Sequence, residues 1–456
     1  MSWQGRYRWK RLFRSSLWIS PVAGMVLALL LAPVIRWLDE RTQWTLLGFG
    51  PDGAKAVIGA LSSSLLTFVV FAFSILLLSV QVAGSQLSPR VIARVFETRL
   101  SRATLTAFVF SYIYSLAALG RVEGRVPQLP VLLVILSSLA GIALFIGLIQ
   151  SASHDLRPIS VLASVAEDTR AVIDVAYPHP FVPGTRQERR AALDTAAPAR
   201  AVRHFGRSSA VLAFDVVGLV EIATRAGCVI ELVPQVGDFL PTGAELFRLH
   251  GAGAGAVDEG HLVRAVALGP ERTLEQDPAF GFRIIVDIAS KALSPAINDP
   301  TTGALALDQL EHLLHLLSTR QLSTGVATDS SGEVRLYYRA PGWDDFVTLA
   351  VTEIRLYGAT SPQVTRRLMA MLEHLLRVVP AERARELEAE MTLLQHTIER
   401  SYADPEDRRR AAVADREGFG SRASASAPRT AVASSPVPVA VTPAGPEGRN
   451  AGGGPA

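Results

Sequence analysis

The chain of 456 residues contains one cysteine, Cys228, and three lysines, Lys10, Lys55 and Lys291. A single cysteine excludes an intramolecular disulfide and a cysteine-based metal cluster, so we interpret Cys228 as a small buried apolar residue. Arginine therefore carries nearly all of the positive charge, and the formal net charge is only +3. Arginine in place of lysine, with abundant alanine, reflects genome composition, so no nucleic-acid partner is predicted.

Catalytic signatures are also missing. The sequence has no Walker phosphate loop, no nucleophile elbow and no H-E-x-x-H zinc motif. The glycine-rich segment Gly251–Gly255 lacks the Gly-Lys-Ser/Thr of a phosphate loop, and we interpret it as a connector. These absences disfavour an enzyme, and the sequence indicates no particular cofactor or metal.

Charged residues and histidine are absent from four apolar stretches in the first third of the chain: Leu17–Ile35, Ala56–Val82, Ala103–Leu119 and Leu129–Ile149. A membrane-spanning helix needs about 20 apolar residues, so all four are predicted to span a membrane, with the third the shortest. The first stretch lacks a signal-peptide cleavage site and is predicted to be retained. The lack of charge inside these stretches disfavours a proton-coupled transporter.

Basic residues in the short loops predict the orientation. They are frequent before the first stretch (Arg6, Arg8, Lys10, Arg11, Arg14) and between the second and third (Arg90, Arg94, Arg99, Arg102), and rarer in the other two loops (Arg36, Arg41 and Lys55; Arg121 and Arg125). The positive-inside rule then predicts a multi-pass protein of the bacterial plasma (inner) membrane, with both termini in the cytoplasm.

The second stretch carries a polar stripe, which consists of Ser63, Thr67, Ser74 and Gln81. Their spacings of 4, 7 and 7 residues place them on one face of a helix. One interpretation is a pore lining. The other is helix–helix packing through small and hydroxylated residues.

The remaining chain is predicted to be soluble and of mixed α and β structure. After a transmembrane region at 1–153, we expect a helix and linker at 154–200 and a small β-rich unit, barrel or sandwich-like, at 201–250. A mixed, mainly helical domain is expected at 251–415. The last segment, 416–456, is rich in Ala, Pro, Ser and Gly and is predicted to be disordered.

The most distinctive segment runs from Arg272 to Thr302. Apolar residues recur at helical spacing from Phe280 to Ala292, and Ser294-Pro295 predicts the end of that helix. Asp299-Pro300 then predicts a second helix, with the aspartate as N-cap and the proline at the first helical position.

Three segments together resemble a known family. They are Gly237-Asp238-Phe239, the Arg272-Thr273-x-x-Gln276-Asp277 motif and the run from Asp287 to Thr302 that contains Ser294-Pro295-Ala296-Ile297-Asn298-Asp299-Pro300. They resemble the DUF2254 family of predicted bacterial membrane proteins over roughly residues 15–400. The resemblance implies a multi-spanning N-terminal part and a large soluble part. It implies no catalytic residues.

The polar residues of these motifs are candidates for one site: Arg272, Gln276, Asp277, Asp287, Asn298 and Asp299. Together they would bind a metal through carboxylates or a small anion through Arg272. The alternative is a polar network that caps and joins two helices. His312 and His315, next to Glu311, are either metal ligands or part of a solvated helix face.

Three functions remain open from the sequence. The first is an oligomeric, channel-like or transport protein with a cytoplasmic regulatory domain, which implies a homo-oligomer. The alternative is a membrane-anchored signalling or scaffold protein whose soluble domain binds a ligand or partner. The third is a metal-dependent enzyme that uses Asp277, Asp287 and Asp299.

Overall fold

A computed structural model describes residues 3–7, 18–42, 47–48, 50–82, 84, 87, 98–120, 122, 126–155, 157–184, 198–323 and 325–418. Most of the predicted linker and nearly all of the predicted tail, at 185–197 and 419–456, lie outside these residues. The first residues of that tail are described, and the carbonyl of Gly418 accepts a hydrogen bond from Gln363.

Within the described part of the chain, four helices are long and apolar enough to cross a membrane, which confirms the predicted membrane region. They are α2 (Ile19–Thr42), α3 (Pro51–Val82), α5 (Arg99–Leu119) and α6 (Gln128–Asp155). Helix α5 has 21 residues because it begins at the N-cap Thr98, before the apolar stretch. At a rise of 1.5 Å per residue it is about 31 Å long, enough for a bilayer core.

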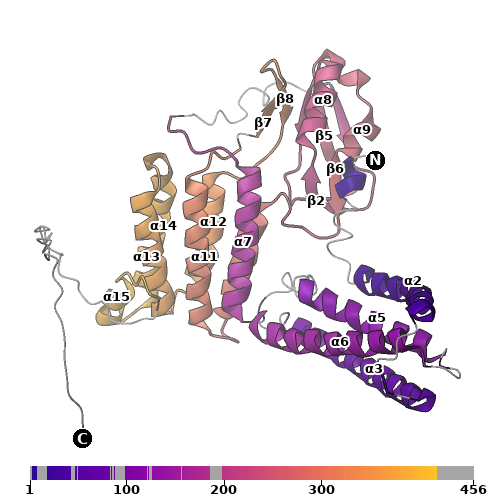
Figure 1. Ribbon diagram of the computed structural model, residues 1–456. Coiled ribbons are helices and arrows are strands. Elements are labelled where there is room, and N and C mark those ends of the chain that lie inside the picture. The colour runs from indigo at the N-terminus through magenta and orange to yellow at the C-terminus, as the bar shows by residue number, and fades with distance from the viewer. Residues whose placement is uncertain are drawn as a thin grey trace, which may run out of the picture. The chain divides into compact units, whose positions relative to one another are not determined.

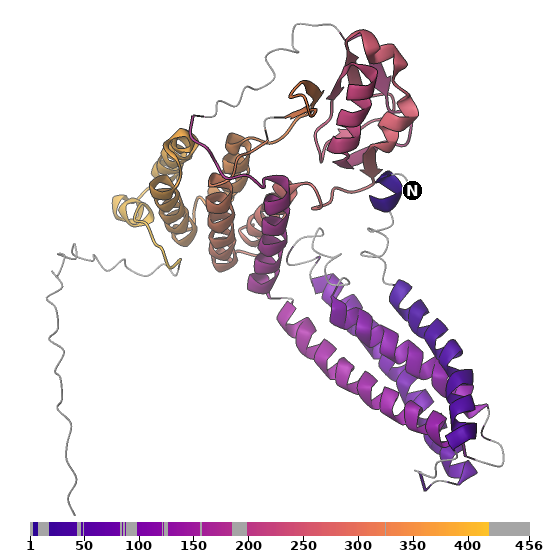
Figure 2. The ribbon, with the colours of Figure 1, turned by 45° about the horizontal axis from the view of Figure 1, so that its top comes forward.

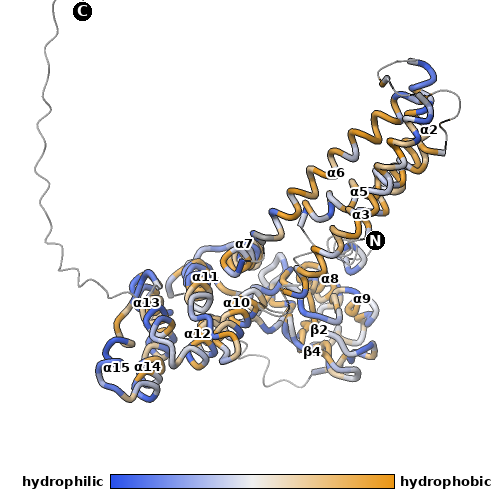
Figure 3. Tube along the Cα trace, turned by 90° about the horizontal axis from the view of Figure 1, so that it is seen from below, coloured by the Kyte–Doolittle hydropathy of each residue, from blue (hydrophilic) through white to orange (hydrophobic). Residues whose placement is uncertain are grey.

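Helix α5 lies at the centre of the bundle and contacts the other three helices. The rings of Phe68 on α3, Phe108 on α5 and Phe145 on α6 meet at centroid distances of 5.3–6.0 Å. Gly141 of α6 lies directly against Phe108, so a Cβ there would be 3.1 Å from the ring. The surface of the bundle is apolar, with exposed Leu30, Phe71 and similar side chains, as hydrocarbon requires (Figure 3).

The strands form two open sheets. The larger has the order β1-β5-β3-β8-β7 and the smaller the order β4-β2-β6. The strands are β1 (Arg200–Arg203), β2 (Ser209–Phe214), β3 (Val229–Leu232), β4 (Phe239–Leu240), β5 (Glu245–His250), β6 (Val266–Gly269), β7 (Val326–Thr328) and β8 (Val334–Tyr337). Neighbours pair antiparallel except β3 and β8, which are parallel.

The expected barrel is not supported, because neither sheet closes among the described strands. Helix α8 (Val216–Ala226) contacts β3, β7 and β8, and its Leu219 and Ala223 join the apolar core that both sheets share. A helix therefore buries the apolar faces that the closure of a barrel would otherwise bury. The segment after β5 is helical as well, with η3 (Ala252–Ala256) and α9 (Glu259–Arg264), so Gly251–Gly255 is not a plain connector.

The other helices stand side by side in a helical domain (Figures 1 and 2). They are α7 (Pro158–Ala176), α10 (Pro278–Ala292), α11 (Pro300–Ser318), α12 (Trp343–Tyr357), α13 (Pro362–Val378), η4 (Ala381–Arg383), α14 (Ala384–Ser401) and α15 (Pro405–Ala411). Helix α10 contacts α7, α11 and α12, and eleven of its fifteen residues are buried. A Cβ at Gly281 would be 2.0 Å from Thr169 Oγ1, so only glycine allows α10 to cross α7 this closely.

Two buried arginines join the helices of this domain. Arg355 of α12 forms an ion pair with Glu390 of α14 at 3.3 Å, and both side chains are more than nine-tenths buried. Arg383 donates to the carbonyls of Leu317 and Arg320 at the end of α11, and burial lowers its pKa to about 10. Such a cation at a helix C-terminus satisfies carbonyls that have no partner within the helix.

Glu390→Gln should lower the free energy of unfolding of the helical domain by about 3–5 kcal/mol, because it removes a carboxylate and leaves the buried Arg355 guanidinium uncompensated. The substitution keeps the volume of the side chain. Urea titration of the protein in detergent, followed by far-UV circular dichroism, measures the change.

The matched control is Glu406→Gln, which removes an exposed ion pair with Arg409 and should have a much smaller effect, because water already screens that pair. Equal effects of the two substitutions would show that burial of the Arg355–Glu390 pair contributes nothing.

Candidate functional site

Arg272 holds the sheets against the first turn of α10. Its guanidinium pairs with the carboxylate of Asp277, and Nη2 donates to Oδ1 at 3.0 Å. Asp277 is the N-cap of α10 and accepts from the amide of Phe280 at 3.1 Å. Arg272 lies over the ring of Phe280 on one side and against the backbone of Gly237 on the other. We call Arg272, Asp277, Phe280 and Gly237 the clamp.

Gln276 adds a second link between the two parts. Its side-chain oxygen accepts from the amide of Phe214 at 3.1 Å, and its nitrogen donates to the carbonyl of the same residue at 3.4 Å. Phe214 ends β2, so the amide of Gln276 pairs with that strand as a neighbouring strand would. The Arg272-x-x-x-Gln276-Asp277 motif is therefore explained by contacts between the sheets and α10.

A cavity of about 430 Å³ lies beside the clamp, between the sheets and the helices. Its wall combines the loop before Gly237, the segment after β8 and the first turns of α10 and α12. The polar side chains in this wall are Gln235, Ser323, Tyr338, Arg339 and Asp345. A cavity of this size with a few convergent polar groups at the junction of two subdomains has the usual features of a small-molecule site.

Two titratable groups near the clamp are perturbed. Burial raises the pKa of Asp277 above the usual range of a carboxyl, although the Arg272 guanidinium opposes this effect. Burial also raises the pKa of the Tyr177 phenol, and the nearby Asp277 and Tyr338 raise it further. Both effects follow from the removal of water around the clamp, which penalises the charged form of each group.

The cavity wall itself holds charges of both signs. Arg339 has about half of its side chain exposed, and Nη1 lies 3.9 Å from the carboxylate of Asp238. Asp345 is engaged by the backbone, because its carboxylate accepts from the amide of Gly342 at 2.7 Å as part of the cap of α12. Arg339 is thus a cation available to a ligand that displaces the long contact with Asp238.

The other predicted site residues do not join this cluster. Asp287 pairs with Arg283, which also binds Glu353 of α12. Asp299 caps α11 through the amide and hydroxyl of Thr302 at 3.1 and 2.6 Å. Asn298 lies in the turn before it, with a φ of 49°. Helix α10, with fifteen residues and about 22 Å long, separates Asp277 from the Asn298–Asp299 turn.

This separation also bears on the proposed metal site. Asp277 and Asp287 lie ten residues apart on one helix, about 15 Å along its axis, so they cannot ligate one ion together. Within the described ranges, no group of three His, Cys, Asp or Glu side chains is arranged to hold a metal. Glu311 instead binds His374 and Arg367 of α13, while His312 and His315 are exposed.

The polar stripe on α3 lies on the exposed side of that helix, away from the rest of the bundle. Within it, the hydroxyl of Thr67 donates to the carbonyl of Ser63 at 3.2 Å, a contact inside the same helix. The hydroxyl that joins α3 to α5 lies on the buried side of α3, where Ser62 bonds Ser115 at 2.8 Å. The stripe therefore makes no helix contact within the described residues of this chain.

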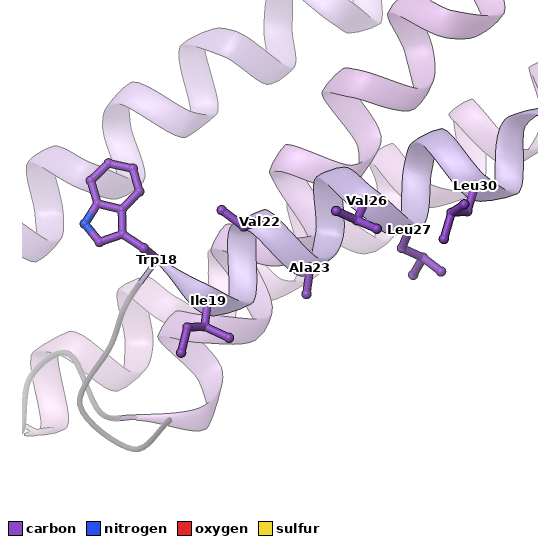
Figure 4. Close-up of a pocket in the computed structure, with 7 residues that line it drawn as sticks. All are labelled: Trp18, Ile19, Val22, Ala23, Val26, Leu27 and Leu30. Carbon is purple, nitrogen blue, oxygen red and sulfur yellow. The ribbon is translucent and has the colours of Figure 1, made fainter. Parts of the chain in front are cut away.

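An apolar groove follows α2, lined by side chains from Trp18 to Leu30 (Figure 4). Its lining is almost purely apolar, with no charged group to orient a polar ligand. We interpret it as part of the lipid-facing surface.

Most of the cavity wall has no signature in the sequence. Gln235, Ser323, Tyr338 and Arg339 belong to loops that are far apart in sequence, and none has a motif of its own. The one local signal is Gly237-Asp238-Phe239, which begins two residues after Gln235 and contributes Gly237 to the clamp.

Gly237→Ala should destabilise the clamp, because a Cβ there would lie 2.3 Å from Arg272 Cζ and the residue has a φ of 92°. We expect a loss of more than about 1 kcal/mol in the free energy of unfolding, measured by urea titration. Gly243→Ala is the matched control, since its φ is 86° and nothing lies within 4 Å of the added methyl group. An equal loss in both variants would show that the Arg272 contact adds no stability.

Comparison with known proteins gives relatives without an assigned role. The uncharacterized proteins Mb1321c of Mycobacterium bovis and Rv1290c of Mycobacterium tuberculosis are each 28% identical over 414 residues, which cover 87% of this chain and 78% of each relative. No solved structure matches the chain.

A family model described as "Predicted membrane protein (DUF2254)" matches residues 14–374. This range includes all four apolar helices, both sheets, the clamp and the cavity wall. The protein therefore belongs to the DUF2254 family of predicted membrane proteins.

Proposed function

We propose that this membrane protein is a membrane-anchored signalling or scaffold protein whose soluble region binds a small polar ligand in the cavity beside the clamp. The observation that carries the proposal is the cavity of about 430 Å³ at the junction of the sheets and the helical domain. A ligand there would contact both parts and would stabilise one arrangement of them. Ligand binding between two subdomains would thereby shift the equilibrium between their arrangements, which is a signal that a partner can detect.

The polar groups of the wall define the class of ligand. Arg339 offers a guanidinium for a carboxylate or phosphate, and Gln235 and Ser323 offer both donors and acceptors. The hydroxyls of Ser323 and Tyr338 lie 2.7 Å apart, and the partly exposed side chain of Leu349 supplies apolar surface. A small organic anion with additional hydroxyl or amide groups fits this combination.

The proposal includes a location. The soluble region and both termini lie in the cytoplasm, and the helices span the plasma (inner) membrane, as the distribution of basic residues over the loops supports. Among the described residues, Arg6 before α2 and Arg99 and Arg102 at the start of α5 belong to the basic side.

A ligand of this class should raise the free energy of unfolding by about 2.7 kcal/mol at a concentration of 100 times its Kd. Thermal-shift measurements on the detergent-solubilised full chain would test nucleotides, sugar phosphates, dicarboxylates and amino acids. Ala340→Trp, which places an indole in the cavity wall, should remove the shift.

The control is Ser330→Trp, which adds the same side chain at the exposed β7–β8 turn and should keep the shift. The proposal fails if no compound class shifts the wild-type protein, or if Ala340→Trp responds as the wild type does.

The polar stripe on α3 favours a second candidate, an oligomeric, channel-like or transport protein with a cytoplasmic regulatory domain. A glutamine and three hydroxylated residues on one exposed face of a membrane helix fit poorly against acyl chains. A second copy of the chain would cover them, either by packing or around a hydrated path.

If copies of the chain meet at a common axis lined by the polar stripe, residues of the stripe should cross-link between copies. In a Cys228→Ala background, Thr67→Cys should form disulfide-linked dimers in vesicles under oxidation. Phe73→Cys, also exposed on α3 but roughly 120° away around the helix, should not. Planar-bilayer recording adds the functional measurement, in which Thr67→Leu or Ser74→Leu should change the conductance. Absence of both cross-linking and conductance would exclude this candidate.

A further inference from the structure

The loop between α10 and α11, Ser294–Asn298, presents uncharged side chains to the outside. We call it the motif loop, because it holds most of the Ser-Pro-Ala-Ile-Asn-Asp-Pro sequence. Pro295, Ala296, Ile297 and Asn298 are all exposed, although Ile297 is a large aliphatic residue. The backbone of the loop is closed on itself, since the carbonyl of Ser294 accepts from the amides of Ile297 and Asn298 at 3.1 and 2.8 Å.

Backbone contacts fix the conformation of the motif loop. Asn298 has the left-handed φ of 49°, and the amide of Asp299 returns to the carbonyl of Ala292 at 2.7 Å. The carboxylate of Asp299 is engaged by Thr302. A rigid turn therefore presents an isoleucine, and the carboxylate of Asp299, which follows the loop, is occupied with capping α11.

A contact with α3 places the motif loop near a membrane helix end. Lys291, three residues before the loop, donates from Nζ to the carbonyl of Gly84 at 2.8 Å. Gly84 lies two residues beyond Val82, the last residue of α3. Leu87, a little further on, is buried in the apolar core of the helical domain. Two described residues just beyond α3 therefore contact the helical domain, one of them at the C-terminal end of α10.

The connection between α6 and α7 gives independent evidence that the C-terminal end of α10 lies close to the membrane. Helix α6 ends at Asp155 and α7 begins at Pro158, so the start of α7 is close to the membrane. Thr169 lies eleven residues, about 16 Å, along α7 and meets α10 at Gly281. From Gly281, α10 runs ten residues, about 15 Å, to Lys291. Tyr177, just after α7, lies close enough to Asp277, the N-cap of α10, for the two groups to interact, so the two helices run in opposite directions. These lengths therefore return Lys291 to the level at which α7 began, in agreement with the Gly84 contact.

We propose that the motif loop lies in the headgroup region of the bilayer, with Ile297 directed toward the acyl chains. The partner is the lipid surface beside the ends of α3 and α6. An exposed aliphatic side chain next to basic residues is the combination that interfacial segments use, and Lys291 and Arg157 supply the cations at this level. The loop adds a membrane contact to the helical domain that the membrane helices alone do not provide.

The experiment uses the full chain with Cys228→Ala and Ile297→Cys, labelled with an environment-sensitive fluorophore and reconstituted into phosphatidylcholine–phosphatidylglycerol vesicles. Brominated acyl chains should quench about half of the emission, since interfacial segments lie within about 5–10 Å of the acyl boundary. Ala296→Cys provides a second position in the loop, so the result does not depend on one variant.

Val175→Cys is the matched control, because Val175 is an exposed aliphatic residue at the opposite end of α7. Its label should be unaffected by brominated lipid and quenched by iodide in the water. Strong lipid quenching at 297 and 296 but not at 175 supports the proposal. Equal and weak lipid quenching at all three positions, with full access to iodide, overturns it.

Discussion

The burial of α10 is the constraint on which the region outside the membrane helices depends. Eleven of its fifteen residues are buried, and it contacts α7, α11 and α12 at once. Gly281 allows the close crossing with α7, and Phe282 packs against Phe346 of α12 at 5.1 Å between ring centroids. A core helix of this kind has little freedom to shift, because packed interiors tolerate few displacements. The groups that contact the two ends of α10 are therefore held in fixed positions relative to each other.

Those two ends carry the two features of functional interest. The N-terminal end carries Asp277, through which Arg272 and Gly237 join the sheets and define the cavity. The C-terminal end carries Lys291, which binds the carbonyl of Gly84 just beyond α3. The long central motif is thus a helix with specialised ends: Asp277 caps α10 at its N-terminal end, whereas Asp299 lies beyond its C-terminal end and caps α11. A rigid helix between the cavity and the end of α3 is a physical basis for coupling between these two places. Measurements at both places would demonstrate such coupling.

Several expectations from the sequence agree with the structure because they rest on local chemistry. The apolar stretches form long helices, and the Asp299-Pro300 cap begins α11, since hydropathy and capping depend on neighbours in sequence. The barrel among the expected β architectures is not supported, and strand patterns alone do not show that α8 covers the sheets or that β8 pairs beside β3. The cavity wall escaped prediction for the same reason: Gln235 and Arg339 meet only after the sheet is assembled.

The sequence by itself determined the membrane region, the positions of the helices around the central motif and the membership in a family. Those properties follow from runs of side chains whose spacing is set by a single helix. Only the tertiary structure decided that Arg272 and Asp287 serve different contacts, that the α3 stripe faces outward and that a cavity forms beside the clamp. Long-range contacts between sheets and helices set these relations, and residue spacing along the chain carries no direct record of them.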